Sequence, residues 1–185
     1  GNGAEWDPYD EAISWGCDLS QEDWDVLTAR VDVMDMGYVR CMINSPYLYW
    51  DAGRNAYDRD RNIEKLCRIL QYCQDNDITV IYGEFNPPTP SMKDSERWVE
   101  MSVNYLNHLV NDLGFDCIKH FVIFNEPDGD WATTDGDLDL WLSMARRFDA
   151  EMASYPGLKE RVSLAAPDVV VHWVHPRTGL AAADW

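Results

Sequence analysis

The chain has 185 residues, of which 46% are hydrophobic and 12% aromatic, and this composition predicts one globular domain rather than a disordered segment. Its net charge of −18 argues against partners that are themselves negatively charged, which excludes nucleic acid and anionic membrane surfaces. No apolar stretch approaches the length of a bilayer span and no signal peptide is visible, so we expect a soluble, processed protein without membrane insertion.

The first predicted helix begins at Ser20, where a capping-box-like Ser-Gln-Glu-Asp sequence places acidic residues in the first turn, and it ends at Gly37. Residues 38–43 follow as a short strand that ends at Asn44. A polar and aromatic loop over residues 45–53 comes next.

The same succession of helix and strand recurs along the rest of the chain. Apolar residues at helical spacing alternate with short apolar runs, and Pro87 and Pro88 forbid one of these runs from continuing beyond Asn86. The predicted helices cover residues 61–76, 94–113 and 137–153, and the strands that follow them cover residues 78–82, 118–124 and 161–166.

Strands that alternate with amphipathic helices must pair in parallel, because each helix returns the chain to the same end of the sheet. The pattern fits either a closed barrel or an open doubly wound sheet. No GxGxxG or GxxxxGK[ST] sequence follows a strand, which disfavours the nucleotide-binding version of the open sheet.

The most informative segment is the apolar run 118–124, which ends abruptly in Asn125-Glu126-Pro127. A buried strand that presents a carboxylate and an amide at its carboxyl end is how parallel α/β barrels build active sites. A plain strand ending is the alternative, since Asn and Pro both interrupt strand pairing. We favour the functional interpretation because the surrounding chain keeps the strand and helix rhythm.

The Asn125-Glu126-Pro127 sequence, with Arg40 near the end of an earlier strand, resembles the retaining glycoside hydrolases of clan A, which are (β/α)8 barrels similar in shape to families 5 and 39. The opening residues 1–6 look like the end of their first strand. The resemblance implies an α/β fold, a TIM (β/α)8 barrel of which this chain covers about the first five βα units. It covers nearly the whole chain, but only the Asn-Glu-Pro element is specific.

The resemblance also implies roles for individual residues. Glu126 would be the general acid/base, Asn125 would hold the sugar 2-hydroxyl, and Arg40 would hydrogen-bond the nucleophile. The nucleophile itself is expected on a later strand, beyond residue 185. An eight-stranded barrel typically needs about 250 residues, so we expect residues 1–185 to be a partial catalytic domain, truncated at the C-terminus and also at the N-terminus.

Several residues near predicted strand ends are candidates for binding the substrate. Sugars stack their apolar faces on aromatic rings, and polar side chains meet their hydroxyl groups. For the loop aromatics we favour binding over packing, whereas Glu5 and Glu84 are as easily solvated loop acids and Asn86 as easily a loop cap. The substrate-binding candidates are Tyr47, Trp50, Glu84, Asn86 and Trp131, with Trp6 as a weaker one.

The sequence predicts neither a metal site nor a cofactor. His172 and His175 are three residues apart, but no third ligand is evident. The acidic run that starts at Asp128 lacks the residue order of an EF-hand. The five cysteines form no CxxC pair and no metal-type spacing, so we expect them to be mostly small buried apolar residues.

The leading functional hypothesis is therefore a retaining glycosidase that cleaves a polysaccharide or oligosaccharide. The alternative is a non-catalytic glycan-binding protein on the same barrel, since no second catalytic carboxylate can be assigned within the chain. A barrel enzyme that uses metal or phosphate chemistry fits less well. Acidic composition and many tryptophans suit a secreted protein, so the expected location is extracellular or periplasmic.

Overall fold

The computed structural model describes residues 2–8, 18–170 and 172–185. Their centre is a five-stranded parallel sheet whose strands follow one another in sequence order. An open doubly wound sheet would reverse its order near the middle, whereas a barrel wall adds each strand at the same edge. The strands are β1 (Asn2–Glu5), β2 (Met36–Ile43), β5 (Thr79–Glu84), β6 (Ile118–Val122) and β7 (Ser163–Leu164).

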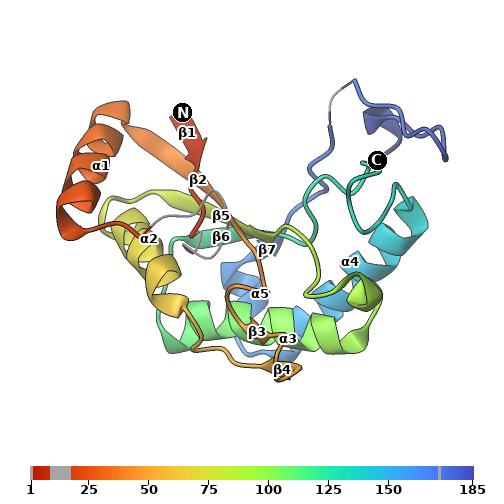
Figure 1. The fold of residues 1–185 in the computed structure, drawn as a ribbon, viewed down its shortest axis with the longest axis horizontal. Coiled ribbons are helices and arrows are strands. Elements are labelled where there is room, and N and C mark those ends of the chain that lie inside the picture. The colour runs from red at the N-terminus through yellow and green to blue at the C-terminus, as the bar shows by residue number, and fades with distance from the viewer. Residues whose placement is uncertain (1, 9–17, 171) are drawn as a thin grey trace.

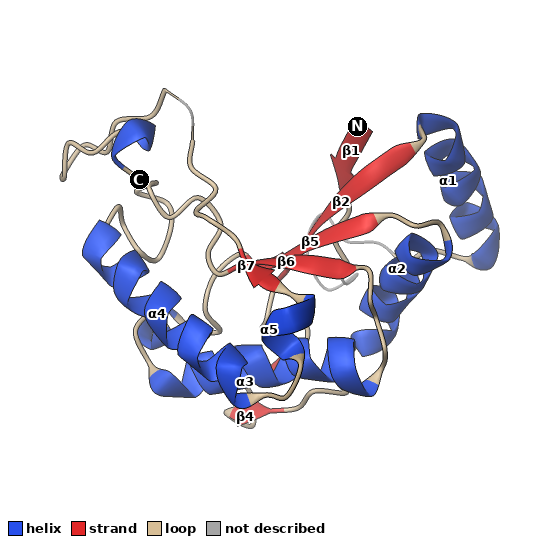
Figure 2. Cartoon of the chain, turned by 180° about the vertical axis from the view of Figure 1, so that it is seen from behind, coloured by secondary structure: helices blue, strands red, loops and turns tan. Residues whose placement is uncertain are grey.

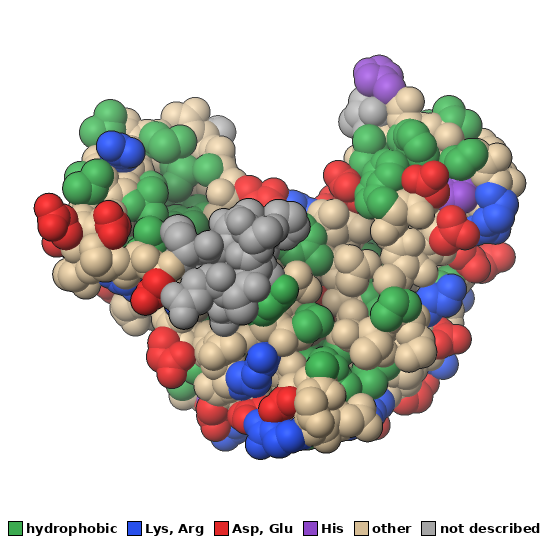
Figure 3. Space-filling view, in the orientation of Figure 1, with side chains coloured by type: hydrophobic (Ala, Val, Ile, Leu, Met, Phe, Trp, Pro, Cys, Tyr) green, Lys and Arg blue, Asp and Glu red, His purple; other side chains and the backbone are tan. Residues whose placement is uncertain are grey.

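The helices lie along the outer side of the curved sheet, as expected for right-handed crossovers that all run the same way. Figures 1 and 2 show two arms on either side of the strands, one containing β1 and α1 and the other the C-terminal segment, and the space-filling view of Figure 3 shows a hollow between these arms. The helices are α1 (Gln21–Met34), α2 (Ile63–Asp75), α3 (Glu96–Asn107), α4 (Leu138–Ser154) and the short α5 (Leu158–Arg161).

Most of the predicted elements are confirmed, with differences at their ends. Ser20 caps α1, and its capping box with Asp23 is formed. The prediction that Gly37 ends this helix was wrong, because Asp35 already takes a left-handed conformation with φ 46° and Gly37 lies within β2. The last strand was predicted over residues 161–166, but Arg161 ends α5 and β7 has only two residues.

Smaller elements were not predicted. The loop after β2 contains a two-stranded antiparallel pair, β3 (Trp50–Asp51) and β4 (Ala56–Tyr57). α3 continues into a π-helical turn at His108–Asp112, and short 3-10 turns occur at Pro90–Met92 and Ala182–Asp184. Strands this short carry too few residues to show an alternating pattern.

The hydrophobic core lies between the sheet and the helices. Alternate residues of β2 and β5 face it, and the residues between them face the hollow. Gly83 lies on the hollow side, where a side chain would come within 2.8 Å of the Val122 carbonyl oxygen. The helix-facing strand residues Val39, Cys41, Ile43, Val80 and Tyr82 are all completely buried.

The cysteines whose structure is described carry free thiols. Cys41, Cys73 and Cys117 are buried in the core, as predicted, and Cys67 is half-buried. Burial raises the pKa of Cys67 and of Cys117 to about 11, which keeps these thiols protonated and unreactive at neutral pH. Cys17 and Gly1 lie outside the described residues.

Among the helices that the structure describes, not one has the length and apolar character needed to cross a lipid bilayer.

Candidate active site

Arg40 is the centre of a polar cluster that joins residues from β1 and β2 and from the segments after β6 and β7. It projects from β2 toward the hollow, and its Nη1 donates to Glu5 Oε2 on β1 at 2.7 Å. Its Nη2 donates to Asn125 Oδ1, just beyond β6, and to the carboxylate of Asp168, beyond β7. Residues 5, 40, 125 and 168, which are far apart in the sequence, therefore meet at the carboxyl end of the sheet.

The electrostatics of this cluster follow from partial burial among opposite charges. Burial lowers the pKa of Arg40, but the carboxylates of Asp168 and Glu5 outweigh burial and raise it, so the guanidinium stays charged. Burial raises the pKa of Asp168, and this effect exceeds the lowering by Arg40 and by the Glu126 N–H. The Arg40 guanidinium is thus a fixed positive charge that two carboxylates and one amide oxygen hold in place.

Glu126 stands beside this cluster in an unusual backbone conformation. Asn125 pairs with Asp168 in an isolated parallel bridge, and the Glu126 N–H donates to Asp168 Oδ1 at 3.1 Å. Glu126 has φ 46°, a left-handed conformation that is uncommon for residues other than glycine and that occurs often at functional sites. The side chain is half-buried, and its Oε2 accepts a hydrogen bond from the Trp131 indole at 2.9 Å.

The arrangement can position a carboxyl group for proton transfer. Asp168 holds Arg40 with one oxygen and the Glu126 backbone with the other, so both oxygens serve to position neighbours. Glu126 contributes a partly exposed carboxyl group, and its backbone N–H shares Asp168 with Arg40. Figure 3 shows acidic and basic side chains gathered at the floor of the hollow between the two arms.

Two further residues connect the loops around this site. Asn86, in the loop after β5, accepts hydrogen bonds at its Oδ1 from the backbone N–H and the hydroxyl of Thr133, at 3.4 and 3.2 Å. Asp128 is buried and accepts from the Val170 N–H at 3.0 Å. Asn86 therefore ties two loops together at the edge of the site, and a contact between Asn86 and a sugar stays a prediction.

Glu84 is not part of the site, which corrects its assignment as a substrate-binding residue. It is completely buried on the helix side of β5. Its Oε2 accepts from the Tyr49 hydroxyl at 2.7 Å and from the Trp98 indole at 3.1 Å, and its Oε1 accepts from Ser102. Side chains alternate along a strand, and Gly83 rather than Glu84 occupies the hollow side.

Trp50 also lies away from the site, contrary to its prediction as a sugar-binding residue. It is 1% exposed, and Arg97 of α3 stacks over its ring at 5.0 Å. The loop that carries it folds over the helix layer, where the Tyr57 hydroxyl donates to Asn104 of α3 at 2.7 Å. Tyr47 is half-buried in the same loop, and its proposed contact with a sugar stays a prediction.

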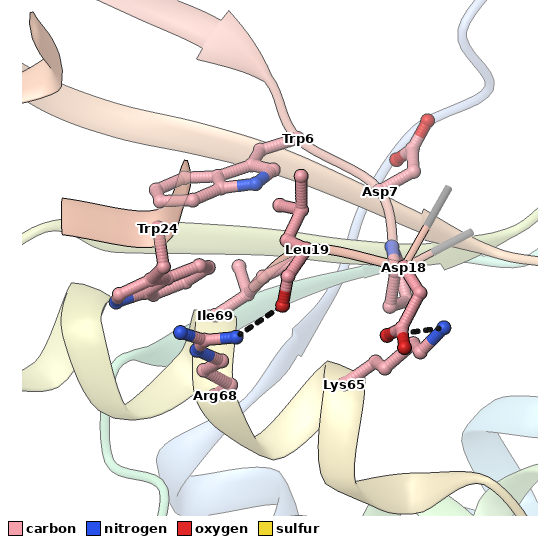
Figure 4. Close-up of a pocket in the computed structure, with 9 residues that line it drawn as sticks. Trp6, Asp7, Asp18, Leu19, Trp24, Lys65, Arg68 and Ile69 are labelled. Carbon is pink, nitrogen blue, oxygen red and sulfur yellow. Dashed lines mark hydrogen bonds and ion pairs between the residues drawn. The ribbon is translucent and has the colours of Figure 1, made fainter. Parts of the chain in front are cut away.

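Trp6 takes part in an aromatic cluster instead of the polar site. Its ring lies 5.3 Å from that of Trp24 on α1 and 5.4 Å from that of Tyr72 on α2. Figure 4 shows Trp6 and Trp24 on one side of a small pocket and Arg68 on another, with the Arg68 guanidinium 4.1 Å from the Trp24 ring centre. Trp6 is half-buried by this packing, and its proposed contact with a sugar stays a prediction.

The sequence interpretation missed two residues at the site and underestimated a third. Asp168 follows the predicted strand 161–166 but was given no role, and Trp173, whose ring centre lies 4.9 Å from that of Trp131, was not considered. Glu5 was treated as a loop acid that could equally be solvated, yet it forms an ion pair with Arg40. The only signal for Asp168 and Glu5 was their position just after or at the end of a strand.

Within the described parts of the chain, no three His, Cys, Asp or Glu side chains are grouped closely enough to hold a metal ion. His175 is buried, and its Nδ1 accepts from the backbone N–H groups of Arg177 and Thr178 at 3.2 Å. Its Nε2 therefore carries the proton and donates to Asp135 at 3.1 Å. His175 is a link between loops in this structure.

Comparison with solved structures identifies the architecture. The chain is similar to a family 39 enzyme from Xanthomonas axonopodis pv. citri, with 12% identity and a TM-score of 0.59 over 90% of this chain and 35% of that one. It is also similar to a family 39 β-xylosidase from Caulobacter crescentus, with 14% identity and a TM-score of 0.57 over 93% of this chain and 41% of that one. A family 5 endoglucanase of broad specificity from Clostridium longisporum shares 15% identity, with a TM-score of 0.54 over 84% of this chain and 46% of that one.

The fold is about five βα units of a TIM barrel. The matched proteins are (β/α)8 glycoside hydrolases, and this chain spans 35% to 46% of their lengths. At 12% to 15% identity the likeness shows the fold alone. No protein-family model matches the sequence, and a search of curated proteins found no match.

Proposed function

We propose that this chain provides the acid/base side of a retaining glycosidase active site and that Glu126 is the general acid/base. The observation that carries the proposal is the position of Glu126 and Asn125 at the carboxyl end of β6, with Arg40 of β2 hydrogen-bonded to Asn125 across the sheet. The likeness of the fold to glycoside hydrolases supports the same class of reaction.

The reaction uses two carboxyl groups in two steps. Protonated Glu126 gives its proton to the glycosidic oxygen while the bond from C1 to that oxygen breaks and a partner carboxylate forms a new bond to C1. The Glu126 carboxylate then takes a proton from water, whose oxygen attacks C1 and releases the partner carboxylate. The sugar therefore leaves with its original anomeric configuration.

The partner carboxylate belongs, in this proposal, to one of the barrel strands that follow β7 in a closed eight-stranded wall. In retaining enzymes the two carboxyl groups lie about 5–5.5 Å apart, which requires nearby strand ends. In this proposal the Arg40 guanidinium, which faces the hollow, keeps such a carboxylate ionised. Asn125 offers its amide to a ring hydroxyl, and such hydrogen bonds strengthen in the transition state.

The test is Glu126→Gln in the full-length protein, with an aryl glycoside whose leaving group is poor. General acid catalysis contributes about 10²–10⁴-fold, so kcat/KM falls by that factor. The matched control is Glu100→Gln, which changes an exposed glutamate on α3 and leaves kcat/KM unchanged. Undiminished activity of the Glu126 variant would reject the assignment. Sugar binding without any turnover by the unaltered protein would favour a glycan-binding protein instead.

We also propose that the substrate is a polysaccharide or oligosaccharide and that the protein acts outside the cytoplasm. The acidic composition and the nine tryptophans support this proposal. Fractionation of the source cells tests the location, and recovery of the protein only from the cytoplasm would contradict it.

A further inference from the structure

Two tryptophans from different loops pack together beside Glu126. Trp131 follows β6 and Trp173 follows β7, and their ring centres are 4.9 Å apart with the planes inclined by 58°. Trp131 is 50% exposed, whereas Trp173 is half-buried and supports it from behind. Figure 3 shows hydrophobic side chains gathered on this arm of the molecule, beside the hollow.

The two loops are fixed to each other on both sides of the tryptophan pair. Before the pair, the buried Asp128 carboxylate accepts from the Val170 N–H. After it, His175 donates to Asp135, and Gly136 packs so closely that a side chain there would lie 2.5 Å from the His175 ring. Figure 1 shows the loop after β6 and the C-terminal segment side by side. The aromatic surface is therefore built before any ligand arrives.

Glu126 separates this aromatic pair from the polar cluster. On one side its Oε2 accepts from the Trp131 indole at 2.9 Å. On the other side its backbone N–H is held by Asp168, which also binds Arg40. The acid/base thus has a charged, hydrogen-bonding neighbourhood on one flank and an aromatic neighbourhood on the other.

The chemistry assigns a part of the substrate to each flank. The sugar that is attacked at C1 must lie near the partner carboxylate and hence near Arg40. The oxygen that receives the proton lies next to Glu126, and the group that leaves with this oxygen extends past Glu126, away from Arg40. That direction leads to Trp131 and Trp173.

We propose that Trp131 and Trp173 form a subsite for the leaving group and that this subsite takes a sugar ring, which stacks its apolar face on Trp131. The inference rests on the proposed function, because it needs Glu126 to be the proton donor. It adds the class of leaving group, a saccharide rather than a small alcohol, and it assigns Trp173 as the residue that holds the stacking surface in place.

The experiment compares two substrates of the full-length protein, the oligosaccharide that it cleaves fastest and the glycosyl fluoride of the same terminal sugar. The fluoride has no ring on the leaving side and needs no proton from Glu126. Trp173→Ala is expected to lower kcat/KM for the oligosaccharide about tenfold, the loss of one ring contact, and to leave that for the fluoride within about twofold. Trp173→Phe, which keeps a ring, is expected to recover most of the loss.

Trp185→Ala is the matched control, because Trp185 is another half-buried tryptophan packed on a second one, Trp141, at 6.4 Å. This variant is expected to leave the ratio of the two kcat/KM values unchanged. Equal losses on both substrates in Trp173→Ala, or no loss on either, would overturn the subsite. Glu126→Gln, measured on the same pair, separates the two proposals: an unchanged kcat/KM for the oligosaccharide overturns the proposed function and the subsite with it. A loss in Glu126→Gln without a selective loss in Trp173→Ala overturns the subsite alone.

Discussion

Glu84 and Glu126 stand at the ends of neighbouring parallel strands, yet the fold gives them opposite surroundings. Glu84 ends β5 and points into the core, where Tyr49, Trp98 and Ser102 all donate to it. Glu126 lies beyond β6 in a left-handed conformation, half-buried, and receives one indole hydrogen bond. Position at a strand end is therefore not enough to make a carboxylate functional, because the face of the strand decides between core and hollow.

Alanine substitutions at the two glutamates are expected to affect different properties, catalysis at Glu126 and stability at Glu84. Glu126→Ala lowers kcat/KM for a poor leaving group by about 10²–10⁴-fold and changes the free energy of unfolding by only about 0.5 kcal/mol. Glu84→Ala lowers the free energy of unfolding by about 2–4 kcal/mol, because it leaves a cavity and three buried donors without their acceptor. Enzyme kinetics and urea denaturation measure the two effects, and a Glu84 variant of normal stability would contradict the comparison.

The stability of the protein should depend on pH through Glu84. Burial raises the pKa of Glu84 from 4.5 to about 7, despite the hydrogen bonds that lower it. The folded protein therefore binds one proton more than the unfolded chain between these values. The stabilisation from this extra proton on Glu84 is complete below about pH 4.5 and is lost as pH rises to about 7. The free energy of unfolding falls by about 3 kcal/mol over this range.

Glu84→Gln removes this titration and keeps the shape of the side chain. Urea denaturation measures the free energy of unfolding at pH 5 and at pH 7.5. From the lower to the higher pH, this free energy is expected to decrease less in the variant than in the unaltered protein. Glu100→Gln, at an exposed position, provides the control. Equal pH dependence in all three proteins would show that Glu84 does not titrate in this range.

Arg40→Met tests the polar flank of Glu126. Removing the guanidinium leaves the carboxylates of Glu5 and Asp168 without their cation, and we expect kcat/KM to fall about 10–100-fold. The free energy of unfolding is expected to fall by about 1–3 kcal/mol. Arg54→Met is the control, since Arg54 pairs with Asp51 and Asp58 at the surface and such pairs contribute about 0–1 kcal/mol. Equal kcat/KM values for the two variants would show that Arg40 does not contribute to the active site.

The smallest effect is expected for Trp131→Phe. This change keeps an aromatic ring but removes the indole N–H that donates to Glu126. A hydrogen bond to a charged group contributes about 1.5–3 kcal/mol when buried, and this one is half-exposed, so we expect kcat/KM to fall about threefold to tenfold. The loss should be larger for poor leaving groups than for good ones, and equal losses would mean that the indole does not position Glu126.

Much of the fold could be predicted because its main helices are long and periodic and are separated by short apolar runs. The alternation of helix and strand is visible in the apolar pattern, and parallel pairing follows from it. The face of β5 could not be predicted, because residues 78–82 are mostly apolar and give no alternation that separates core from hollow. Glu84 was therefore placed on the wrong side.

The site was predictable only in part for a similar reason. Asn125 and Glu126 follow a recognisable strand and Arg40 lies within another, whereas Asp168 acquires its role by pairing with Asn125, 43 residues earlier in the chain. Trp173 lies in a segment without regular periodicity, and its position depends on the links from Asp128 and His175. Trp50 was placed at the site because the β3–β4 pair that contains it is too short to recognise.

The central claim is that Glu126 delivers a proton beside a retaining carboxylate, and the reaction of Glu126→Ala with azide tests it most directly. The glycosyl intermediate forms from an aryl glycoside whose leaving group needs no proton. The smaller side chain leaves room for azide, which attacks this intermediate without the help of a base. We predict that azide restores turnover and that nuclear magnetic resonance of the product shows a glycosyl azide with the anomeric configuration of the substrate. A glycosyl azide of inverted configuration, or full activity of the variant without azide, would contradict the account.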